Sequence, residues 1–119
     1  MTSQTRYTVA TIPAEEHILI SYDTAADFQD LNRLANCTMG TIVLIPTDEN
    51  HSIWCDDEAI LRGSPFNRRA SFLTKSAVFG DVVLTASDPD TGKSLNINPR
   101  FISRSFSETY SLLPFIHLN

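Results

Sequence analysis

Alternating apolar and polar positions predict two strands near the start of the chain. Residues 7–12 (YTVATI) alternate and are rich in β-branched side chains, which is typical of a half-buried strand that ends before Pro13. Residues 17–22 (HILISY) predict a second strand. Only the short segment PAEE separates the two strands, so we expect an antiparallel hairpin.

A helical pattern follows the predicted hairpin. Its apolar positions recur at spacings of three and four residues, namely Ala25, Phe28, Leu31, Leu34 and Ala35. Such a stripe predicts a helix over about residues 24–36 with one face toward a core. We expect Asp23 or Thr24 to cap the first N–H groups, and Asp27 to add favourable negative charge to the first turn.

The middle of the chain holds a continuous apolar run. Residues 41–45 (TIVLI) are apolar and β-branched and stop at Pro46, which predicts a strand buried on both faces, or nearly so. Residues 52–56 (SIWCD) predict its hairpin partner. A further short strand is expected at Ile60 and Leu61.

A Ser-Pro pair then predicts a second helix. Ser64 can accept hydrogen bonds from the first N–H groups, and Pro65 at the first helical position lacks an N–H that would otherwise stay unpaired. We expect this helix to run to about residue 75. Its core-facing positions are expected to be Phe66, Ala70 and Leu73.

The last third of the chain repeats the order of strand, turn and helix. Residues 80–86 (GDVVLTA) predict a strong strand, and the turn at 88–93 leads into a hairpin partner at 94–97. The Asn-Pro pair at 98–99 again predicts a helix start. Hairpins and helices therefore interleave. This order predicts one α+β domain over residues 1–119, with a mixed or mainly antiparallel sheet built from hairpins and two or three helices packed against it.

Composition supports a folded chain and argues against several classes of protein. At 119 residues, with 42% hydrophobic and 19% charged side chains, the chain can bury a core without disulfides or metal. Its start lacks the basic and apolar segments of a signal peptide, and no apolar run reaches the roughly 18 residues of a membrane span. We therefore expect a cytoplasmic protein without a membrane partner. The composition predicts no oligomeric state.

The net charge of −5 is unevenly distributed. Residues 1–60 hold two basic and ten acidic side chains, whereas residues 61–119 hold seven basic and four acidic ones. The two halves could attract each other in the folded chain, or they could present two electrostatic faces to partners. Because the sequence pI is near 4.9, we expect no appreciable nonspecific binding to duplex DNA at physiological salt.

Potential catalytic and metal-binding side chains gather around the predicted strand at 52–56. The densest group comprises His51, Cys55, Asp56, Asp57 and Glu58. Their spacing matches no zinc or calcium motif, and alternation along a strand would turn neighbouring members to opposite faces. A nucleophilic pair would need one of the two cysteines beside His17 or His51, and nothing in the sequence positions them so. We therefore expect no metal, no cofactor and no catalytic residue, which makes an enzyme the weaker hypothesis.

Basic residues form the stronger candidate for a contact surface. Four of them occur without an intervening acid, namely Arg62, Arg68, Arg69 and Lys75. On the predicted second helix the two adjacent arginines would lie about 100° apart, with their guanidinium groups in water. This cluster is either a solvated helix face with salt bridges to nearby acids, or a docking surface that binds an acidic protein or nucleic-acid phosphate, and the second is our hypothesis for partner binding. Asp56, Asp57 and Glu58 would either form a secondary acidic surface or pair with these bases.

Five segments taken together resemble a known family. They are the helix at 23–36, the run from Gly40 to Pro46, the acidic strand end at 54–58, the helix start Asn67-Arg68-Arg69-Ala70, and the strand Gly80–Leu84. In this order they resemble the DUF3846 family of small uncharacterised proteins from phages, plasmids and actinobacteria, over about residues 24–87. The resemblance implies an accessory gene product of a mobile element, and it supplies no reaction.

Two hypotheses of function follow. The first is a non-enzymatic accessory protein of a phage or mobile element that binds a host protein, for example to inhibit a defence or regulatory system. The second is a small enzyme or small-molecule-binding domain with a pocket between sheet and helices. A stoichiometric host protein in an affinity capture favours the first, whereas a co-purified small molecule or turnover favours the second.

Overall fold

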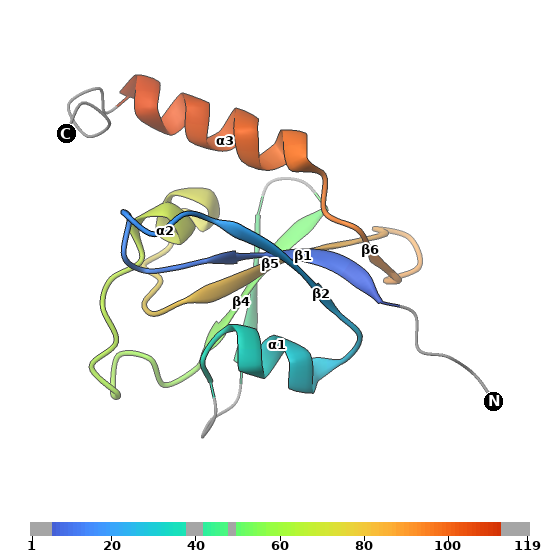
Figure 1. The fold of residues 1–119 in the computed structure, drawn as a ribbon, viewed down its shortest axis with the longest axis horizontal. Coiled ribbons are helices and arrows are strands. Elements are labelled where there is room, and N and C mark those ends of the chain that lie inside the picture. Colours follow the sequence, from blue (N-terminus) through green and yellow to red (C-terminus); the bar gives the residue numbers. More distant parts are fainter. Residues whose placement is uncertain (1–5, 38–41, 48–49, 113–119) are drawn as a thin grey trace.

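The computed structural model describes residues 6–37, 42–47 and 50–112, with side chains up to residue 106. The strands are β1 (Tyr7–Ile12), β2 (Ser21–Ala25), β3 (Ile42–Pro46), β4 (His51–Asp56), β5 (Val82–Ser87) and β6 (Ser94–Leu95). The helices are α1 (Phe28–Leu34), α2 (Arg68–Thr74) and α3 (Pro99–Leu112), and Figure 1 shows the arrangement. This is an α+β fold with an antiparallel sheet, as the sequence predicts.

The sheet is organised around β5. Its strand order is β2-β1-β5-β4-β3, and β6 also pairs with β5. Leu84 of β5 lies opposite Ala10 of β1. Further along β5, Ala86 lies opposite Leu95 of β6. The predicted hairpins β1–β2, β3–β4 and β5–β6 are all confirmed. The run of buried residues in β5 fits its central place between two neighbouring strands.

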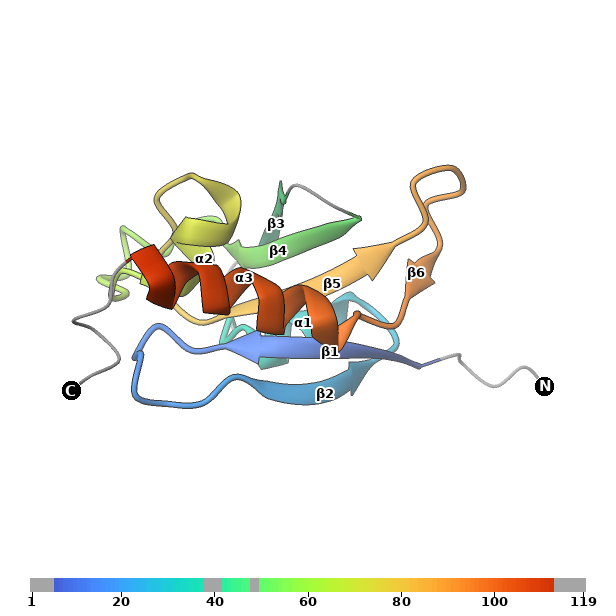
Figure 2. The ribbon, with the colours of Figure 1, turned by 90° about the horizontal axis from the view of Figure 1, so that it is seen from above.

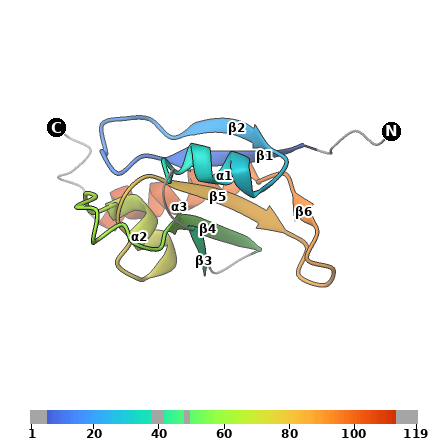
Figure 3. The same ribbon diagram turned by 90° about the horizontal axis from the view of Figure 1, so that it is seen from below.

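Helices cover both faces of the sheet. α2 and α3 lie on one face and α1 lies on the other, as the two views in Figures 2 and 3 show. The larger core, under α2 and α3, includes Ile12, Ile53, Leu84, Leu73 and Phe101. The smaller core, under α1, includes Val9, Ala25, Leu31, Ala35 and Val83. No helix among the described residues is long and apolar enough to cross a membrane.

The apolar run at 41–45 is an edge strand, contrary to the prediction of burial on both faces. Within the described residues β3 pairs with β4 alone, and Leu44 is 48% exposed. Thr41, the first residue of the predicted strand, lies outside the described residues. Pro46 fits an edge position because it has no N–H to donate to a further strand. An apolar run reports hydrophobicity and does not report how many strands flank it.

The second strand and the first helix begin later than predicted. β2 runs from Ser21 to Ala25, and the antiparallel register with β1 places Ala25 opposite Tyr7. Residues that the periodicity assigns to a helix start are therefore held in the sheet. The cap of α1 is Asp27, whose Oδ1 accepts a hydrogen bond from the backbone N–H of Asp30 at 3.0 Å.

Helix α2 also begins later than predicted, at Arg68. Phe66 is extended, because it forms an isolated β-bridge with Phe79, and its ring meets that of Phe79 edge to face. It is half exposed, so only Ala70 and Leu73 of the predicted stripe are buried. The expected strand at Ile60 and Leu61 is likewise wrong. Hydrogen-bonded turns occupy this segment and both side chains are exposed.

Asn67, the cap of α2, ties three elements together. Its side chain is fully buried. Its Nδ2 donates to the carbonyl oxygens of Ile12 and Gly80, both at 2.9 Å, and its Oδ1 accepts from the N–H of Ala70 at 3.0 Å. Its own N–H donates to the carbonyl of Val78 at 2.8 Å. The start of α2 is thus fixed to the end of β1 and the approach to β5.

We predict that Asn67→Ala lowers the free energy of unfolding by about 3 kcal/mol. The variant loses a helix cap, worth about 1 kcal/mol, and the two hydrogen bonds that Nδ2 donates to carbonyl groups, worth about 1 kcal/mol each. Asn98→Ala is the matched control, because the Oδ1 of Asn98 accepts from the N–H of Arg100 at 3.0 Å at an exposed position. Urea unfolding of both variants measures the difference, and equal losses would contradict this account of Asn67.

Candidate functional site

The structure separates the basic residues that the sequence grouped. Arg69 is only 8% exposed. Its Nη2 donates to three backbone carbonyls of the β1–β2 connection, those of Pro13 at 2.7 Å, Glu15 at 3.2 Å and Ile18 at 2.9 Å. The expectation that both adjacent guanidinium groups reach water is therefore wrong for Arg69. It lies one helical turn before buried Leu73, on the face of α2 that meets the rest of the fold.

The other predicted contact residues lie at the surface. Arg62 pairs with Asp56 at 2.7 Å and with Glu58 at 3.3 Å, and Arg68 pairs with Glu16 at 3.5 Å. Each pair joins the base-rich half to the acid-rich half. Asp57 is exposed in the turn after β4, and Lys75 is exposed at the C-cap of α2. Whether Arg62, Arg68 and Lys75 contact a partner, or whether Asp56, Asp57 and Glu58 form an acidic surface for one, stays a prediction.

The candidate nucleophiles and metal ligands are dispersed. Cys37 and Cys55 are buried free thiols. Burial raises the pKa of Cys55, and the nearby Asp56 adds to that effect, so its reactive thiolate form is disfavoured. His51 is buried at the other end of β4, where its ring stacks on Phe101 with centroids 4.1 Å apart. Among the described residues, no three His, Cys, Asp or Glu side chains gather as a metal site would require.

A groove of about 460 Å³ lies on the α1 face of the sheet. It runs between the start of α1 and strands β3, β4 and β5, and we call it the α1 groove. Its lining residues are Tyr7, Ala26, Asp27, Phe28, Leu31, Leu44, Ser52, Trp54, Thr85, Ala86, Ser87, Gly92 and Ser94. Tyr7, Phe28 and Trp54 are aromatic, and Asp27 is the one charged side chain of this described lining.

Trp54 and Phe28 form a corner of the α1 groove. Trp54 lies near the middle of β4, and its indole N–H donates to the Oγ1 of Thr85 on β5 at 2.9 Å, which fixes the ring. The ring of Phe28 meets it edge to face, with centroids 5.4 Å apart. Phe28 is nevertheless 63% exposed, because it is the first residue of α1 and projects at the rim. The stripe of apolar residues predicted this side chain to face a core.

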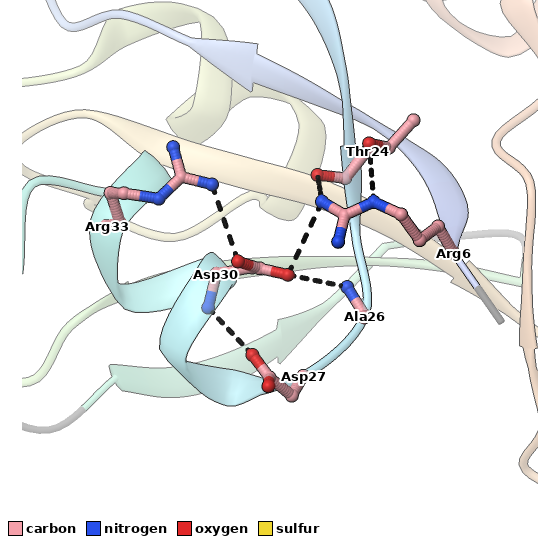
Figure 4. Close-up of polar contacts among 6 residues, drawn as sticks. All are labelled: Arg6, Thr24, Ala26, Asp27, Asp30 and Arg33. Carbon is pink, nitrogen blue, oxygen red and sulfur yellow. Dashed lines mark hydrogen bonds and ion pairs between the residues drawn. The ribbon is translucent and has the colours of Figure 1, made fainter. Parts of the chain in front are cut away.

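The start of α1 is fixed by Asp30 (Figure 4). Its Oδ2 accepts from the N–H of Ala26 at 2.8 Å, and its carboxylate lies 3.6 Å from Arg6 and 3.4 Å from Arg33. The hydrogen bond from Ala26 is the main cause that lowers the pKa of Asp30, with contributions from both arginines. This network holds Asp27 and Phe28 at the groove. The spacing Asp27-x-x-Asp30 resembles a capping box and was the signal that could have revealed this start.

A second groove, of about 470 Å³, lies on the opposite face of the sheet. It is more open, and its lining residues are Leu19, Ile20, Tyr22, Arg69, Ile102, Ser103 and Phe106. The guanidinium group of Arg69 in this lining is already bound to the β1–β2 connection. The α1 groove is therefore the stronger candidate for a functional site.

We predict that Arg69→Met lowers the free energy of unfolding by at least about 2 kcal/mol, because three carbonyl groups lose a charged donor. Arg68→Met is the matched control, since Arg68 and Glu16 form an exposed pair of the kind worth about 0 to 1 kcal/mol. Chemical denaturation of the two variants measures the contrast. A large loss for Arg68→Met, or none for Arg69→Met, would contradict the assignment of Arg69 as the structural residue.

We predict an acid-dependent loosening of α1 that depends on Asp30. Since its folded pKa is lowered, the stabilisation by this carboxylate is present above the unfolded value, near pH 4, and is lost as the pH falls through the folded value. Fluorescence of Trp54, the single tryptophan, reports the change because Phe28 packs against it. Asp30→Asn should loosen α1 already at neutral pH. The control Asp57→Asn should keep the acid transition. If Asp57→Asn also lost the transition, the assignment of the transition to Asp30 would be refuted.

Comparison with known proteins identifies the family and the fold. A search of functionally curated proteins found no match. The crystal structure of the small RNA methyltransferase HEN1 is similar in fold, with a TM-score of 0.56 and 12% sequence identity over 71% of this chain. The match covers 13% of that chain, so it concerns one small part of a much larger protein. The family model for DUF3846, a domain of unknown function, matches residues 7–111, and the chain therefore belongs to the DUF3846 family.

Proposed function

We propose that the protein is a non-enzymatic accessory protein that acts by binding another protein in the α1 groove. The observation that carries the proposal is the exposed Phe28 at the rim, edge to face with a fixed Trp54. Aromatic side chains that are held rigidly and half exposed supply large contact area at a low cost in conformational entropy. Leu44, exposed on the edge strand, extends the apolar rim.

The energetics favour a partner at this place. Burying a side chain such as Phe28 contributes about 1.5–3 kcal/mol relative to leaving it exposed, and the fold gains little of this by itself. The groove and its rim thus offer binding energy that the chain does not use internally. By contrast, two of the arginines that the sequence assigned to docking, Arg62 and Arg69, make close hydrogen bonds within the chain.

The resemblance to proteins of mobile elements supports the kind of partner. We propose that the partner is a host protein of a phage or other mobile element, with inhibition of a defence or regulatory system as the effect. An apolar and aromatic site that is specific for one protein surface suits such a role, because it requires no cofactor and no reaction.

A small molecule is the second candidate occupant. The volume of about 460 Å³ lies within the range of roughly 300–1,000 Å³ that ligand pockets occupy. Its serine and threonine hydroxyl groups could orient such a ligand. Native mass spectrometry of the purified protein tests this candidate, because a bound small molecule adds a defined mass that Phe28→Ser should remove.

We predict that Phe28→Ser reduces recovery of a host protein in an affinity capture by at least tenfold, equivalent to about 1.4 kcal/mol, without unfolding the chain. Leu61→Ser is the matched control, because Leu61 is an exposed leucine outside the groove. Quantitative mass spectrometry of captures with the wild type and both variants measures recovery. A stoichiometric partner that Phe28→Ser still retains would reject the α1 groove as the docking site.

A further inference from the structure

The lining of the α1 groove selects the charge of its occupant. Ring faces are electron-rich and attract cations, and three of the described lining residues are aromatic. The charged member of the lining, Asp27, is an acid, and no lysine or arginine is among these lining residues. The chain as a whole carries a net charge of −5. An anionic occupant is disfavoured on each of these grounds.

The contact between Phe28 and Trp54 leaves ring surface that a cation could contact, and Asp27 has a carboxylate oxygen that could accept a hydrogen bond from it. Two rings that meet edge to face form a corner, so the faces of the edge-on ring are not covered by the other ring. The hydrogen bond from the N–H of Asp30 uses Oδ1 of Asp27, which leaves Oδ2 to accept from an occupant. Arg6 and Arg33, the nearby bases, would repel a cation. Both pair with Asp30, whose negative charge offsets part of theirs.

We propose that the α1 groove binds an arginine side chain of the partner protein, packed against Phe28 and Trp54 with its guanidinium directed to Asp27. This inference rests on the proposed function and names the chemistry of the partner. Arginine suits the site better than lysine, because its planar group stacks on aromatic rings, is weakly hydrated and matches a carboxylate with two N–H donors. Apolar residues beside it would cover Leu44 and the exposed ring of Phe28.

A pair of peptides tests the inference directly. Ac-Gly-Leu-Arg-Leu-Gly-NH2 carries the proposed side chain, and the same peptide with citrulline is its neutral isostere. Binding is followed by the NMR signal of the indole N–H of Trp54, the single tryptophan of the chain. We expect the arginine peptide to bind at least about fivefold more tightly than the citrulline peptide, and we expect higher salt to reduce this difference.

Two variants locate the charge that the arginine recognises. Asp27→Asn keeps a good helix cap and removes the carboxylate. It should therefore reduce the preference for the arginine peptide to the part that the aromatic rings supply. Asp57→Asn removes the same charge at an exposed position outside the groove and should change neither affinity. Circular dichroism of both variants verifies that the fold is retained.

The outcomes separate this inference from the proposed function. Equal binding of the two peptides, a preference that Asp27→Asn leaves undiminished, or no response of Trp54 to either peptide would each overturn the arginine assignment. The proposed function would stand in those cases if Phe28→Ser still abolished capture of the host protein. If capture is unaffected by Phe28→Ser, the proposed function fails, and with it the assignment of a partner protein as the source of the arginine.

Discussion

The buried amide of Asn67 is the contact on which the arrangement of the other elements depends. Three segments meet at this side chain, the end of β1, the approach to β5 and the first turn of α2, and each gives it a backbone group to bind. A side-chain amide offers two donors and an acceptor at once, which is the combination required here. Other small side chains can cap the helix, but a hydroxyl or carboxylate cannot also donate to two carbonyls. The helix start is thereby fixed to the centre of the sheet.

Arg69 likewise donates hydrogen bonds to backbone carbonyls, here those of the connection between β1 and β2. The carbonyls of Pro13, Glu15 and Ile18 belong to a segment that has left the sheet, and one guanidinium group supplies donors to all three. Asn67 and Arg69 lie two positions apart, at the start of the same short helix. α2 therefore works as a polar anchor as well as a hydrophobic layer, since Ala70 and Leu73 fill the core beneath it.

The sequence predicted most strands and helices well, but it predicted poorly which side chains are buried and which strands lie at the edge of the sheet. Alternation and continuous apolar, β-branched runs identified the strands, apart from the one wrongly expected at Ile60 and Leu61. The Asn-x-x-Ala resemblance marked the true start of α2, whereas the Ser-Pro pair did not. The burial of Arg69 follows from carbonyls that lie more than fifty residues away in the chain, beyond the reach of any local pattern. The edge strand β3 and the central strand β5 both begin with a run of apolar, mostly β-branched residues. For the α1 groove, alternation along the strand predicts that Trp54 points to the other face of the sheet from Ile53 and Cys55. The exposure of Phe28, by contrast, depends on where α1 begins.

The position of the α1 groove is itself a consequence of local capping. α1 has seven residues and buries Leu31 and its neighbours over β1 and β5, and Asp30 and Asp27 fix its first turn, where Phe28 meets Trp54 of β4. The part of the sheet beyond that turn presents Trp54 and Leu44 without a helix of this chain above them among the described residues. A sheet face packs its apolar side chains against a second layer. A partner that covers the groove would complete that layer beside the first turn of α1.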